Sequence, residues 1–202
     1  MYRYYLIVML GGPGVLGLIG WLAGDLPPYL AFPVAYAAAV LAFGLGAGAA
    51  ILTRVLPSRI FDPFSRLFRV RKWERKVLVR IGIRHWKDKI PETGALLGYL
   101  SKKTVADRKD NNYLMHFMVE TCYAEFMHMA CVFVGFLIII PALFFAPVYL
   151  FCFAIPVAVI HAILHYLPVL VQRYVRPFLM HTYLHNKAKE EKAAAAKNPQ
   201  TV

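Results

Sequence analysis

Two long stretches of the sequence contain no Lys or Arg. No Lys or Arg lies between Arg3 and Arg54, and none lies between Lys109 and Arg173. Acidic residues are also few, with 11 Asp and Glu against 23 Lys and Arg. A soluble domain of 202 residues does not need the hydrophobic content of 59% that this chain has. The composition therefore predicts an integral membrane protein and argues against an ordinary soluble domain.

Cysteine is scarce, and its placement argues against two further classes of protein. The three Cys residues are at positions 122, 131 and 152, inside apolar or helical stretches and without the spacing of metal ligands. We interpret them as packing residues. The sequence therefore predicts neither a disulfide framework nor a metal site.

The apolar stretches are long enough to predict four transmembrane helices. A helix needs about 20 mostly apolar residues to cross the hydrocarbon core. Such stretches cover residues 5–23 and 30–52, and a longer apolar block is divided by a turn near Phe144 to Pro147 into residues 129–145 and 148–171. The predicted fold class is all-α, a polytopic membrane protein in which residues 1–202 form a single membrane domain.

The basic residues predict the orientation of these helices. In a four-helix arrangement every Lys and Arg falls on one side, which by the positive-inside rule is the cytoplasm. We therefore expect a cytoplasmic segment at 54–112, a cytoplasmic tail at 173–202, and both termini inside the cell. The net charge of +12 then indicates contact with membrane lipids or a phosphate-bearing substrate, and no nucleic acid partner.

Local patterns predict several features of these segments. Asp62 and Pro63 are typical of a helix start, and aromatic and basic residues alternate from Phe64 to Leu78, which predicts a basic amphipathic helix that Gly82 ends or bends. A second short amphipathic stretch is expected at 95–100. A helix should begin near residues 111–112, and the tail from residue 187 should be frayed. Glycines spaced four apart, at 20 and 24 and at 44 and 48, predict close helix packing.

Glu120, Glu125 and His128 form the most informative cluster. At about 100° per residue, His128 lies between the two carboxylates on one helix face, next to Ala124 and Thr121. A carboxylate beside an imidazole orients the ring and raises its basicity, which suits a general base acting on a hydroxyl. The structural alternative is a salt-bridged trio with Arg or Lys. The Glu-x-x-His spacing is also half of a di-iron motif, but the sequence has no second copy.

A second polar face lies on the last apolar stretch. His161, His165, Pro168 and Gln172 share one side of the helix, and Arg173 and Arg176 follow at the membrane border. The histidines could make interhelical hydrogen bonds or line a substrate crevice. The two arginines could bind a substrate or anchor lipid phosphates.

These residues, taken in order, resemble a known family. Arg71-Lys72-Trp73, then Glu120-Thr121-x-x-Ala124-Glu125-x-x-His128, then Pro168-x-x-x-Gln172-Arg173-Tyr174-x-Arg176-Pro177 are similar to motifs of the glycosyl-4,4'-diaponeurosporenoate acyltransferase family, the membrane acyltransferases of the staphyloxanthin type. The resemblance covers about residues 65–180. The chain departs from the family's usual residues at Cys122, Tyr123, Met129 and Tyr166.

The resemblance implies an O-acyltransferase of the bacterial cytoplasmic membrane. Such an enzyme transfers a fatty acyl group from a thioester donor, acyl-CoA or acyl carrier protein, to a hydroxyl of a glycolipid or other lipid-linked acceptor, with no bound cofactor. We expect His128 to be the general base, with Glu125 or Glu120 supporting it. The predicted substrate-binding residues are Arg71, Lys72, Trp73, Thr121, His165, Gln172, Arg173 and Arg176.

Two other functions fit the same sequence. A non-catalytic lipid-binding or scaffold subunit would use the basic amphipathic segment but would not need a titratable base at His128. A small transporter would use His161 and His165, but the chain lacks the repeated halves and broken helices of such proteins.

Overall fold

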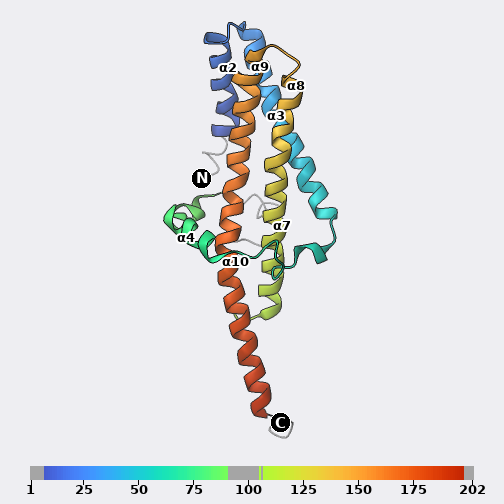
Figure 1. Cartoon of the computed structure of the whole chain (residues 1–202), viewed down its shortest axis with the longest axis vertical. Coiled ribbons are helices and arrows are strands. Elements are labelled where there is room, and N and C mark those ends of the chain that lie inside the picture. The colour runs from blue at the N-terminus through green and yellow to red at the C-terminus, as the bar shows by residue number, and fades with distance from the viewer. Residues whose placement is uncertain (1–6, 91–104, 106, 198–202) are drawn as a thin grey trace. The chain divides into compact units, whose positions relative to one another are not determined.

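The computed structural model describes residues 7–90, 105 and 107–197, and every regular element within them is a helix (Figure 1). Short 3₁₀ and π segments extend or join the α-helices. The elements in chain order are η1 (Ile7–Gly11), α2 (Gly12–Leu22), α3 (Pro28–Val55), η2 (Ser58–Phe61), α4 (Lys72–Arg80), α5 (Ile83–Trp86), η3 (Lys87–Lys89), α7 (Asn111–Gly135), η4 (Phe136–Ile138), α8 (Ile139–Ala142), α9 (Pro147–Tyr149), η5 (Leu150–Ala154) and α10 (Ile155–Lys197). The predicted all-α class is confirmed over this part of the chain.

The contacts group these residues into two compact units. Among the described residues, unit 1 comprises 7–56, 89–90 and 125–169, and unit 2 comprises 57–88, 105, 107–124 and 170–197. The long helices α7 and α10 contribute to both units. The predicted amphipathic stretch at 95–100 lies outside the described residues.

Unit 1 is built on close packing between helices with small residues. On α3, Ala31, Ala35, Ala39 and Ala42 recur every three or four residues and are buried in one core cluster. Helix α2 packs along α3, and a Cβ added at Gly17 would lie 2.6 Å from Phe32. Small side chains let helix backbones approach in this way when water provides no driving force for association.

The glycine pairs of the sequence have different surroundings in unit 1. A Cβ at Gly20 would collide with Phe153, and one at Gly24 would collide with Val148, so this pair packs as predicted. Gly44 and Gly48, by contrast, have no described neighbour within 4 Å of such a Cβ. They line an open apolar groove of about 510 Å³ on α3.

Among the described residues, three helices are long and apolar enough to cross a membrane: Pro28–Val55, Asn111–Ala142 and Pro147–Ala196. The expected turn near Phe144 to Pro147 is present between α8 and α9. The fourth predicted span, at residues 5–23, corresponds to a shorter apolar helix, Ile7–Leu22. This described part is about 24 Å long at a rise of 1.5 Å per residue, and residues 5–6 of the predicted span lie outside the described residues. The helices therefore indicate a membrane protein, and three of the four predicted spans correspond to helices that are long and apolar enough to cross a bilayer.

The basic amphipathic helix of unit 2 is shorter than the sequence suggested. It begins at Lys72, not at Phe64. Residues 63–68 form turns and a bend, and residues 69–71 have no regular structure. The Asp62 carboxylate accepts a hydrogen bond from the backbone N–H of Phe64, and the carbonyl of Phe68 accepts one from Arg176, 2.8 Å away. An external donor thus occupies the carbonyl that a helix would pair with the N–H of Lys72. Gly82, at φ 70°, ends this helical stretch as predicted.

The other two helix ends of unit 2 give one confirmation and one correction. Helix α7 begins at Asn111, where the Asp110 carboxylate accepts hydrogen bonds from the N–H groups of residues 112 and 113, a typical N-cap. The tail is not frayed from residue 187, because α10 continues to Lys197. Its Ala, Lys and Glu residues favour helix, and Glu190 accepts a hydrogen bond from Asn111.

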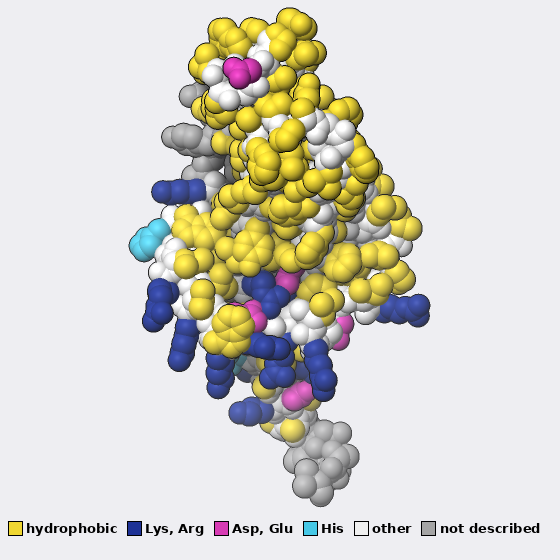
Figure 2. Space-filling model, turned by 45° about the horizontal axis from the view of Figure 1, so that its top comes forward, with side chains coloured by type: hydrophobic (Ala, Val, Ile, Leu, Met, Phe, Trp, Pro, Cys, Tyr) yellow, Lys and Arg dark blue, Asp and Glu magenta, His cyan; other side chains and the backbone are white. Residues whose placement is uncertain are grey.

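Charge is distributed very unequally between the units. The described part of unit 1 has two basic residues, Arg54 and Lys89, and the remaining described Lys and Arg residues belong to unit 2. Figure 2 shows one part of the surface as almost entirely hydrophobic and another part as rich in Lys and Arg. Unit 1 therefore has a surface suited to hydrocarbon, and unit 2 has one suited to head groups and water.

Candidate active site

Helix α7 carries the predicted general base and its acidic neighbours. Glu125 is buried with 6% of its surface exposed, and half-buried His128 follows it by three residues. Side chains at this spacing are neighbours on a helix. Glu120 and Thr121 lie on the preceding turns, in unit 2, and Thr121 is fully buried.

Within unit 1, the structure brings His128 together with both histidines of α10. The Nδ1 atom of His128 lies 3.1 Å from the Nδ1 atom of His165. The rings of His165 and His161 lie next, with centroids 4.4 Å apart. The sequence indicated these residues as two separate polar faces, and nothing in their spacing indicated that the faces meet.

Glycine and aromatic contacts hold His161 at the inner end of this row. A Cβ at Gly135 would collide with its Nδ1, and one at Gly46 would lie 3.1 Å from its Nε2. The ring of Phe43 packs edge-on against it, with centroids 5.0 Å apart. His161 is 1% exposed, and neither ring nitrogen has a hydrogen-bond partner among the described residues.

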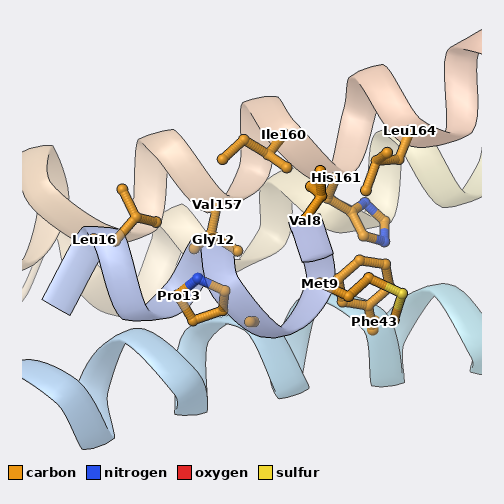
Figure 3. Close-up of a pocket in the computed structure, with 11 residues that line it drawn as sticks. Val8, Met9, Gly12, Pro13, Leu16, Phe43, Val157, Ile160, His161 and Leu164 are labelled. Atoms are coloured by element: carbon orange, nitrogen blue, oxygen red, sulfur yellow. The ribbon is translucent and has the colours of Figure 1, made fainter. Parts of the chain in front are cut away.

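Figure 3 shows His161 beside Phe43 at the border of an apolar cavity in unit 1. The cavity has a volume of about 20 Å³, which is the space of a single water molecule, and it cannot hold a lipid chain. All its lining side chains apart from His161 are apolar. The histidine row, rather than this cavity, is therefore the candidate site in unit 1.

The predicted arginines of α10 have well-defined partners within unit 2. Arg176 is 1% exposed, donates to the Thr121 hydroxyl (2.9 Å), the Thr121 carbonyl (3.0 Å) and the Phe68 carbonyl (2.8 Å), and lies over the Phe68 ring. Arg173 forms a salt bridge with Glu74 of α4 at 2.6 Å. Both arginines thus tie segments of unit 2 together, and their predicted role in binding a donor stays a prediction.

The other predicted binding residues differ in their accessibility. Arg71, Lys72 and Trp73 are exposed at the start of α4, with 59% of Trp73 accessible. Gln172 is buried, and its amide oxygen has no hydrogen-bond partner among the described residues. The first three residues are open to a ligand from solvent, and Gln172 offers a buried acceptor.

Metal chemistry has no geometric support in the part of the chain that the structure describes. No group of three or more His, Cys, Asp or Glu residues there has the arrangement of a metal site. The row of His128, His165 and His161 combines ring contacts with one short N–N distance instead. Its arrangement suits proton transfer, which imidazole carries out near neutral pH.

Comparison with known proteins identifies the family. Neither the curated proteins nor the solved structures contain a match to this chain. A family model described as glycosyl-4,4'-diaponeurosporenoate acyltransferase matches residues 64–183, which is more than half of the chain and includes His128, His165 and Arg176. The family resemblance drawn from the sequence motifs is therefore confirmed, and the chain belongs to the glycosyl-4,4'-diaponeurosporenoate acyltransferase family.

Proposed function

We propose that the protein is a membrane-embedded O-acyltransferase that moves a fatty acyl group from a thioester donor to a hydroxyl of a glycolipid or another lipid-linked acceptor. The family supports the acyltransferase class. The observation that carries the chemistry is the contact of His128 with His165 in an apolar unit, with the buried Glu125 three residues before His128 on the same helix. A buried acid and two imidazoles are costly in such surroundings unless they serve a function.

The proposed reaction is a direct transfer with His128 as general base. His128 takes the proton of the acceptor hydroxyl while the hydroxyl oxygen attacks the thioester carbonyl. The tetrahedral intermediate collapses, the C–S bond breaks, and the thiolate takes the proton from the imidazolium. Glu125, or Glu120 on the same helix, stabilises the imidazolium while it exists.

The donor is proposed to be acyl-CoA or acyl carrier protein, and its phosphates would be recruited by unit 2. The support is the exposed start of α4, where Arg71 and Lys72 stand beside the exposed Trp73. Phosphates bind to such cationic groups through charge-assisted hydrogen bonds. The reaction itself needs no bound cofactor.

We further propose a location in the bacterial cytoplasmic membrane, with unit 2 and both termini on the cytoplasmic side. The charge difference between the units supports this orientation through the positive-inside rule. In this arrangement the helix Ile7–Leu22 is part of the fourth span. It packs along α3, which is one of the three candidate spans. Both soluble thioester donors are cytoplasmic molecules, so they would meet the basic surface directly.

The experiment is turnover of an acyl-CoA donor by purified protein, with membrane lipid extract supplying the acceptor. Release of free thiol gives the rate, and mass analysis of the lipids identifies a species heavier by one acyl group. His128→Ala should reduce the rate by about 10²- to 10⁴-fold, the usual contribution of a general base. Glu125→Gln should also reduce it, because the variant keeps the shape of the side chain but loses the charge.

His116→Ala is the matched control, since His116 is an exposed histidine of the same helix. It should retain the wild-type rate. Each variant is checked for membrane insertion and thermal stability. A folded His128→Ala variant with near wild-type turnover would contradict the mechanism.

A non-catalytic lipid-binding or scaffold subunit is the alternative, and the exposed surface of α4 favours it. Trp73 and Val77 are both about half exposed there among basic side chains. Such a surface binds anionic lipid without any chemistry. Under this alternative no thiol is released by the wild type, and His128→Ala changes the protein only through its stability.

A further inference from the structure

The proposed base lies in direct polar contact with another imidazole. In unit 1, His128 on α7 and His165 on α10 approach through their Nδ1 atoms at 3.1 Å. At this distance one nitrogen must carry a proton and the other must present its lone pair. The contact therefore couples the tautomers of the two rings.

The proposed reaction decides the direction of this hydrogen bond. A base that takes a proton on Nε2 must have that nitrogen unprotonated, so in neutral His128 the proton is on Nδ1. His128 then donates from Nδ1, and His165 accepts on Nδ1 while its own proton is on Nε2. This assignment rests on the proposed function, whereas the N–N contact itself does not.

We propose that His165 is a positioning residue that fixes His128 in the Nδ1–H tautomer and shares the charge of its imidazolium. A catalytic or metal-binding histidine often donates a hydrogen bond from the ring nitrogen that does not take part in the chemistry. The acceptor of that bond fixes the tautomer and orientation of the ring and raises the basicity of its other nitrogen. The sequence alone suggested a role for His165 in binding substrate. In this proposal His165 contacts the general base His128 instead of the substrate.

Packing within unit 1 keeps His165 in place for this role. Its ring contacts His161, whose centroid is 4.4 Å away, and also faces Phe43 at 6.5 Å. His161 is in turn confined by Gly46 and Gly135, where a side chain would meet its ring. His161 makes no hydrogen bond to any described residue, so we assign it packing and not proton transfer.

The test compares two replacements of His165 that differ in one property. His165→Asn can place its amide oxygen, an acceptor, near the position of Nδ1, whereas His165→Leu has no acceptor. The Leu variant should lower kcat by about 10- to 100-fold with little change in KM, as loss of an orienting partner does. The Asn variant should recover most of this loss. His161→Leu, which removes the neighbouring ring, should affect stability more than kcat.

A second measurement reads the tautomer without any turnover. Nitrogen-15 NMR of protein labelled at histidine separates Nδ1–H from Nε2–H, and His128→Ala identifies the His128 signals. Wild type and His165→Asn should show His128 as Nδ1–H, and His165→Leu should lose this preference. If the Leu variant keeps the tautomer, or if the Asn and Leu variants have equal kcat, the proposal is overturned. A wild type with the Nδ1–H tautomer but no acyl transfer would instead reject the proposed function alone.

Discussion

At the scale of single residues, the protein uses polar side chains of two kinds inside apolar surroundings. In unit 1 the histidine row places two imidazole nitrogens 3.1 Å apart, an arrangement suited to proton transfer. In unit 2 Arg176 has three well-formed hydrogen bonds to fixed backbone and hydroxyl oxygens. The histidine row suits a reaction, whereas the hydrogen bonds of Arg176 stabilise the fold of unit 2.

Arg176 gives a prediction that separates these two roles. Replacing it with Met removes the donors to both carbonyls and to the Thr121 hydroxyl, and each buried acceptor left unpaired costs about 1–3 kcal/mol. Arg176→Met should therefore lower the thermal unfolding midpoint in detergent by several degrees. Arg176→Lys should restore little, because an ammonium cannot reproduce the planar fork of donors.

Arg75→Met is the control for this measurement, since Arg75 is exposed on α4. It should leave the unfolding midpoint unchanged. If Arg176→Met has a wild-type midpoint but a raised KM for the acyl donor, the residue binds the donor as the sequence suggested, and its structural role is refuted.

At the scale of helices, the small residues of unit 1 serve two purposes that the sequence does not distinguish. Gly20 and Gly24 meet neighbouring side chains, whereas Gly44 and Gly48 line an open groove. The spacing of the two pairs is the same. The difference arises from which face of each helix has a neighbour, and this is a property of the tertiary arrangement.

The two glycine pairs therefore predict opposite responses to the same substitution. Gly20→Ala forces a methyl group into the Phe153 ring, and such overpacking costs about 1–3 kcal/mol. Gly44→Ala adds a methyl group in open space and should be neutral or slightly stabilising, because Ala favours helix. Thermal unfolding of both variants in the same detergent checks the pair. Equal destabilisation would show that the packing of α2 is not as described.

Particular elements show what could be predicted from the sequence and what could not. The start of α7 and the end of the α4 region were predictable, because Asp110 and Gly82 act on their own neighbours. The start of α4 was not, because the carbonyl of Phe68 is bonded by Arg176, which lies 108 residues away. His128 and His165 were both identified, but their contact spans 37 residues and leaves no periodic signal.

At the scale of the whole molecule, the distribution of charge makes the topology testable. Pro28 begins α3 and Ala146 directly precedes α9, and the turn before each of these helices has no Lys or Arg. Cysteine introduced at either position should react with a membrane-impermeant maleimide added outside the cell. Cysteine at exposed Lys76 on α4 should react only after the membrane is opened.

The background for this labelling replaces the three native cysteines with Ser. Cys131→Ser should be tolerated, because its hydroxyl can keep the hydrogen bond that the thiol makes to the carbonyl of Gly46. Reaction at Lys76 from outside would reverse the proposed orientation. Reaction at Ala146 only from inside would place the turn before α9 in the cytoplasm and contradict the proposed topology.

The length of the last apolar stretch has a consequence for the surrounding lipid. Residues 147–172 extend for about 39 Å at a rise of 1.5 Å per residue. This is longer than the thickness of about 30 Å of a hydrocarbon core, so the helix must tilt or the bilayer must thicken beside it. Because this helix carries His165, the thickness of the host bilayer should affect the contact proposed to position His128. Reconstitution in lipids of increasing acyl length should accordingly give an activity optimum rather than a plateau.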